Sequence, residues 1–78
     1  MSMAAEDPWS IKARALLKAE LKRREVGYAQ LAEKLGAMGV TETQASIANK
    51  ISRGAFTAAF LLQCMEAIGC HTLRLGES

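Results

Sequence analysis

A chain of 78 residues, half of them apolar, has enough apolar side chains for one core and too few for two, so we expect a single domain. A formal net charge of +2 is too small to indicate a nucleic-acid partner by itself, and two cysteines are too few for the disulfide framework of a small secreted domain. No apolar stretch is long enough to span a bilayer, and residues 1–7 lack the apolar segment of a signal peptide. We therefore expect a cytoplasmic protein with reduced thiols and no membrane partner.

The first expected element is a helix over residues 8–26, preceded by a disordered segment over residues 1–7. Asp7 suits the N-cap and Pro8 the first helical position, and Gly27 is the expected stop. Six of the ten basic residues lie in this helix: Lys12, Arg14, Lys18, Lys22, Arg23 and Arg24. They form either a solvated face paired with neighbouring glutamates or an electrostatic surface for a nucleic acid.

Two shorter helices are expected next. An apolar stripe at helical spacing predicts a helix over residues 28–38. Thr41 opens a Thr-Glu-Thr-Gln run with the spacing of a capping box, which predicts a further helix over about residues 42–53. Ile47 and Ile51 lie one turn apart on this helix, and we expect both to face the core.

The fourth expected helix, residues 58–68, is apolar nearly all round and is closed by Gly69. Such a helix is buried on two sides, either because it is central in the domain or because one side faces a second subunit. Residues 70–75 alternate with period two and predict a short strand, with a frayed tail as the alternative. A lone strand leaves its backbone unpaired, so pairing with a second copy would make residues 70–78 a dimerisation element beside a domain over residues 8–69. The expected interface residues are Leu61, Met65, Leu73 and Leu75.

The expected helix over residues 42–53 carries the candidate functional residues. If Ile47 and Ile51 face inward, the remaining surface is polar and contains only two charges. Amide side chains can contact adenine edges, and arginine or lysine suits guanine or phosphate, so this surface is a candidate for contact with DNA. Its polar residues are Thr43, Gln44, Ser46, Asn49, Lys50 and Arg53, of which Thr43 is expected to be a cap.

Short motifs in this region resemble a known superfamily. YAQLAEKLG, residues 28–36, resembles the first helix of repressor-type (lambdoid or Xre-like) helix-turn-helix domains, and TQASI, residues 43–47, is similar to the start of a lambdoid recognition helix. The resemblance implies an all-α, four-helix repressor-like domain, which the expected C-terminal strand would extend. It also implies a homodimeric transcriptional regulator that places its recognition helix in the major groove of double-stranded DNA. Tyr28 matches a phosphate-contacting position, and Gln44 and Ser46 match base-reading positions.

Over residues 9–75 the chain also resembles a small bacterial family of domains of unknown function. The resembling segments include Trp9, LKAELKRR at residues 17–24, NKI at residues 49–51 and AAFLLQ at residues 58–63. That family has no assigned activity, so the resemblance leaves the function open.

Other functions have little support in the sequence. His71 is the only histidine, and together with Cys64 and Cys70 it lacks the ligand spacing of a zinc site. We expect no enzymatic activity, no metal, no cofactor and no small-molecule substrate. The alternative to DNA binding is a protein-interaction or antitoxin-like adaptor, because a fold of this kind does not by itself determine function.

Overall fold

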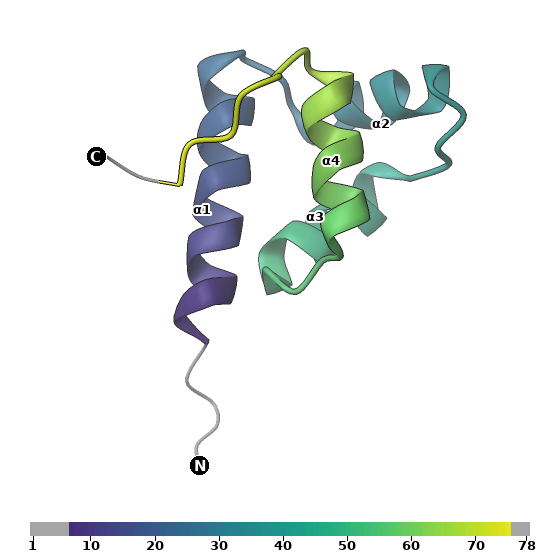
Figure 1. Cartoon of the computed structure of the whole chain (residues 1–78). Coiled ribbons are helices and arrows are strands. Elements are labelled where there is room, and N and C mark those ends of the chain that lie inside the picture. The colour runs from purple at the N-terminus through teal and green to yellow at the C-terminus, as the bar shows by residue number, and fades with distance from the viewer. Residues whose placement is uncertain (1–6, 76–78) are drawn as a thin grey trace.

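Four helices account for most of residues 7–75, the part of the chain that the computed structural model describes (Figure 1). They are α1 (Pro8–Arg23), α2 (Tyr28–Ala37), α3 (Gln44–Arg53) and α4 (Ala58–Ala67). The all-α class and the number of helices predicted from the sequence are confirmed.

The helix starts follow from local side-chain chemistry. Asp7 accepts a hydrogen bond from the backbone N–H of Trp9 at 3.0 Å, and Pro8 occupies the first helical position, as predicted. The cap of α3 is Thr43, whose hydroxyl oxygen accepts from the N–H of Ser46 at 3.0 Å. The predicted cap at Thr41 is wrong, because the Ser46 hydroxyl reciprocates with the N–H of Thr43 at 2.9 Å and completes the capping box there. The helix therefore begins at Gln44.

Residues with positive φ end the helices. Helix α1 stops at Arg23, earlier than predicted, because the chain reverses at Glu25 with φ 57°. The N–H of Val26 then bonds the carbonyl oxygen of Leu21 at 2.9 Å, which satisfies an otherwise unpaired group of the last turn. Gly39, with φ 86°, plays the equivalent role after α2.

The core takes side chains from every helix. Helix α3 packs against both α1 and α2, and α2 packs against α4. Each of the first three helices contributes a pair of buried aliphatic residues one turn apart, which is the spacing that places two side chains on one helix face. The buried apolar residues are Leu17, Leu21, Leu31, Leu35, Ile47, Ile51, Phe60, Cys64, Met65 and Cys70.

The predicted strand over residues 70–75 is wrong, since the structure contains no strand in residues 7–75. The chain instead passes from α4 towards α1 as an irregular segment (Figure 1). Cys70 is buried, and its thiol donates a hydrogen bond to the carbonyl oxygen of Thr72 at 3.3 Å. Residues 70–75 have no regular secondary structure, and no segment within residues 7–75 supplies a partner for a β ladder. Because residues 70–75 form no strand, pairing of two such strands cannot form the predicted dimer interface.

Some predictions concern residues outside the described range. Of the N-terminal segment predicted to be disordered, residues 1–6 lie outside it, and Asp7 caps α1. Residues 76–78 of the predicted dimerisation element also lie outside it. Within the described part of the chain, no helix combines the length and apolar character needed to cross a membrane.

Candidate nucleic-acid interface

Helix α3 turns one face to the core and the opposite face to solvent. Ile47 and Ile51 are fully buried, as predicted. Because 3.6 residues make one turn, the side chains half a turn away point outward, and they are exposed. We call this surface the outer face of α3; it consists of Ala45, Asn49, Ser52 and Arg53, and we include Gln44, which is exposed at the first position of the helix, one turn before Ile47.

The outer face carries three of the predicted DNA-contacting residues: Gln44, Asn49 and Arg53. Within residues 7–75 their side chains form no hydrogen bond or ion pair, so their donors and acceptors face water. Helix α3 also contains no acidic residue that would repel a polyanion. Therefore one amide and one guanidinium project from the side of α3 opposite the core, and a second amide is exposed at the N-terminal end of the helix.

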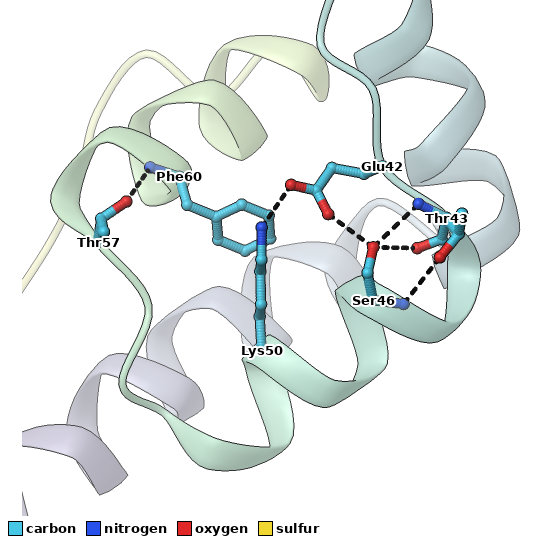
Figure 2. A network of polar contacts seen from close by, with 6 residues as sticks. All are labelled: Glu42, Thr43, Ser46, Lys50, Thr57 and Phe60. Atoms are coloured by element: carbon cyan, nitrogen blue, oxygen red, sulfur yellow. Dashed lines mark hydrogen bonds and ion pairs between the residues drawn. The ribbon is translucent and has the colours of Figure 1, made fainter.

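Two other predicted contact residues are engaged inside the domain. The Ser46 hydroxyl donates to Glu42 Oε1 at 2.6 Å, and Lys50 Nζ donates to Glu42 Oε2 at 2.5 Å (Figure 2). Lys50 Nζ also lies 4.9 Å from the centroid of the Phe60 ring, within the range of a cation–π contact. We call these four residues the Glu42 cluster. It ties α3 to the preceding connection and to α4, so Ser46 and Lys50 position the helix.

The Glu42 carboxylate is the electrostatic centre of this cluster. Its side chain is only 10% exposed, which by itself would disfavour the charged form. The hydrogen bond from Lys50, followed by that from Ser46, outweighs this effect and holds the pKa of Glu42 below its ordinary value of 4.5. The folded domain therefore binds the Glu42 proton less readily than the unfolded chain does.

This lowered pKa predicts an acid-dependent loss of stability. The stabilisation is fully present above the ordinary pKa of Glu42 and is lost as the pH falls through the lower pKa of the folded state. We expect Glu42→Gln to flatten the decline in the free energy of unfolding between about pH 5 and pH 3, because the variant has no carboxylate to protonate there. Urea unfolding at a series of pH values measures this.

The control is Glu33→Gln, which removes an exposed carboxylate from α2. Its pH profile should match that of the unmodified chain. A Glu42→Gln profile as steep as that of the unmodified chain would contradict the role of the cluster.

One predicted DNA-contacting residue, Tyr28, is less accessible than the outer face. It is the first residue of α2, is half-buried and packs against the core.

Arg14 of α1 donates from Nη1 to the carbonyl oxygen of Ser52 at 2.6 Å, and this contact was not predicted. It places a cation at the C-terminal end of α3, where the helix dipole favours positive charge. Lys18 follows one turn later on α1 and is exposed. No sequence pattern links residues 14 and 52, because their contact depends on the packing of two helices.

The remaining chemistry-bearing side chains have structural surroundings. Burial, followed by the nearby charge of Glu42, raises the pKa of the Cys64 thiol to about 12, so the thiol is protonated and weakly nucleophilic. Cys70 is buried, and His71 is exposed. Among the residues that the structure describes, no three His, Cys, Asp or Glu side chains are grouped as metal ligands would be.

The four residues predicted for a dimer interface separate into two groups. Met65 is buried in the core. Leu61, half-buried, and the exposed Leu73 and Leu75 line one apolar groove of about 220 Å³. The other lining residues come from α1: Trp9, Lys12, Ala13 and Leu16.

Comparison with family models identifies the class of this domain. The model described as a domain of unknown function, DUF6471, matches residues 9–73. The chain therefore belongs to the DUF6471 family, in agreement with the resemblance to a family of unknown function found in the sequence. No curated protein and no solved structure matches the chain. None of these comparisons supports the resemblance to repressor domains, which therefore enters only the proposal below.

Proposed function

We propose that this domain is a DNA-binding transcriptional regulator module that places α3 in the major groove of double-stranded DNA and acts as a homodimer. The observation that carries the proposal is the outer face of α3, where Gln44, Asn49 and Arg53 are exposed and have no partner in residues 7–75. The major groove of B-DNA admits an α-helix, and glutamine or asparagine can bond an adenine edge bidentately while arginine bonds guanine.

The small residues of the outer face fit this role. Ala45 and Ser52 lie between the longer polar side chains and let the helix backbone approach the floor of the groove. An alanine methyl can also contact the methyl group of thymine. Base pairs differ in the hydrogen-bond donors, hydrogen-bond acceptors and methyl groups that they present in the major groove. The polar and apolar side chains of the outer face can contact each of these.

The rest of the fold holds α3 for such contacts. Helix α2 packs directly against α3, as the first helix of a helix-turn-helix does against the recognition helix. The Glu42 cluster fixes the start of α3 on α4, and the Arg14 bond to Ser52 fixes its end on α1. Because both ends are anchored inside the domain, the outer face is presented with little freedom, which lowers the entropy lost on binding.

Selection of bound duplexes from a random DNA pool tests the proposal directly. We expect enriched palindromes whose half-sites are about 34 Å apart, the distance of one helical turn. Affinity for an enriched duplex should also fall steeply as salt rises, because cations that contact phosphates release counterions. Failure to bind any duplex at low salt would contradict the proposal, and enriched sites without symmetry would contradict its dimeric part.

A second candidate is a protein-interaction or antitoxin-like adaptor without sequence-specific DNA binding. Two observations favour it: the net charge is only +2, and Ala45 and Ala48 of α3 have no side-chain hydrogen-bonding group with which to contact base edges. In that case the outer face of α3 would bind a protein. The variant described in the Discussion separates the two candidates.

A further inference from the structure

An apolar groove opens between α1, α4 and the C-terminal segment. Trp9 at one side is 73% exposed, and Leu75 is 63% exposed. Together with Leu73 they leave on the order of 350 Å² of apolar surface in water, which is within the size range of surface patches that mediate interactions. Trp9 contributes most because an indole is the largest side chain available.

The groove and α3 occupy different flanks of α1. Trp9, Ala13 and Leu16 follow one another at helical spacing and line the groove. Ser10 and Arg14 lie on the flank that approaches α3. A partner seated in the groove therefore leaves the outer face of α3 accessible.

We propose that the occupant is a second copy of this chain, related by a two-fold axis, with Trp9 of each copy seated in the groove of the other. This inference rests on the proposed function, which calls for two copies, and it locates their contact. A projecting indole beside an apolar recess on the same surface is self-complementary, as a two-fold interface must be. No strand pairing is involved.

The area and the charges both fit a second copy. A stable interface buries about 800 Å² on each partner, of which roughly 56–65% is apolar, so the groove supplies most of the apolar part. Lys12 lines the groove, Asp7 is the N-cap of α1 two residues before Trp9, and Arg74 lies between Leu73 and Leu75. In the proposed dimer, an antiparallel approach of the two α1 N-termini would bring Asp7 of each copy towards Lys12 of the other. An all-cationic or all-acidic rim would instead repel its own copy.

Sedimentation equilibrium combined with tryptophan fluorescence tests the dimer on the full chain. Trp9 is the only tryptophan, so its emission reports on this groove alone. We expect the mass to double from 8.4 kDa and the emission to shift to shorter wavelength over the same range of protein concentration. Leu75→Gln should raise the dimer dissociation constant by on the order of 100-fold, because each dimer loses two buried leucines.

Leu62→Gln is the matched control. Leu62 is 65% exposed, nearly the same as Leu75, but it does not line the groove. This variant should dimerise like the unmodified chain, and circular dichroism should show that both variants are folded. A monomer at every concentration, equal weakening by both variants, or a spectral shift without a change in mass would each overturn the proposed dimer.

Binding to a duplex with a single half-site distinguishes this inference from the proposed function. Leu75→Gln should bind that duplex with unchanged affinity, because one copy contacts one half-site. Unchanged half-site binding by a chain that never dimerises would overturn only the groove interface. A dimer that forms through the groove and binds no duplex would overturn only the DNA-binding proposal.

Discussion

Gly54→Ala is expected to destabilise the domain by about 3 kcal/mol, because it combines two unfavourable effects. Gly54 has φ 67°, a left-handed conformation that costs a non-glycine residue about 1–2 kcal/mol. A Cβ atom at this position would also overlap the backbone carbonyl oxygen of Ser10 in α1. Backbone atoms cannot rotate aside, so the end of α3 would have to move away from α1, and overpacking of this kind costs about 1–3 kcal/mol.

Gly39→Ala is the control for the conformational cost alone. Gly39 has φ 86°, but a Cβ there meets no atom within 4 Å. We expect this variant to lose only about 1–2 kcal/mol. Urea unfolding of both variants measures the difference. Equal losses for Gly39→Ala and Gly54→Ala would show that α3 does not approach α1 as closely as the structure indicates.

The double variant Asn49→Ala, Arg53→Ala should lower the affinity for a selected DNA duplex by on the order of 100-fold or more, since each good bidentate base contact contributes about 1–3 kcal/mol. Both side chains are exposed on the outer face, and neither supports the core. The variant should therefore keep its free energy of unfolding. Fluorescence anisotropy with a labelled duplex measures the loss, and urea unfolding measures the stability.

Lys22→Ala, Gln63→Ala is the matched control, because it removes one cation and one amide from α1 and α4. Only the nonspecific electrostatic part of the affinity should change, by about tenfold or less. If the outer-face variant bound DNA as tightly as this control but failed to capture a protein partner, the adaptor function would replace the DNA-binding proposal. If it lost DNA affinity selectively, the adaptor function would be excluded for this surface.

The sequence was most informative where the structure depends on near neighbours. Asp7 caps the helix that Pro8 begins, because the bond from the Asp7 carboxylate spans only two residues. Ile47 and Ile51 face the core because residues one turn apart share a face. The exposure of Asn49 follows from the same geometry, because it lies half a turn away from both isoleucines. Contact of these residues with DNA stays a prediction.

The sequence was least informative where two local solutions compete. Thr41 and Thr43 are both acceptable caps, and the choice of Thr43 depends on the hydroxyl of Ser46 and on the carboxylate of Glu42 turning towards Lys50. The C-terminal alternation suited a strand as well as an irregular segment that places Leu73 and Leu75 beside the groove-lining residues of α1. A β ladder needs a partner strand, and no neighbour in the described fold supplies one.

From its amino acids alone, the chain determined an all-α domain, the approximate positions of four helices and the inward face of α3. These properties depend on side-chain periodicity and on hydrogen bonds across a few residues. The tertiary structure decided that Lys50 binds Glu42 over the Phe60 ring and that α3 touches α1 at Gly54. It also decided that Trp9 and Leu75 line one groove, because contacts between distant residues exist only after the helices have packed.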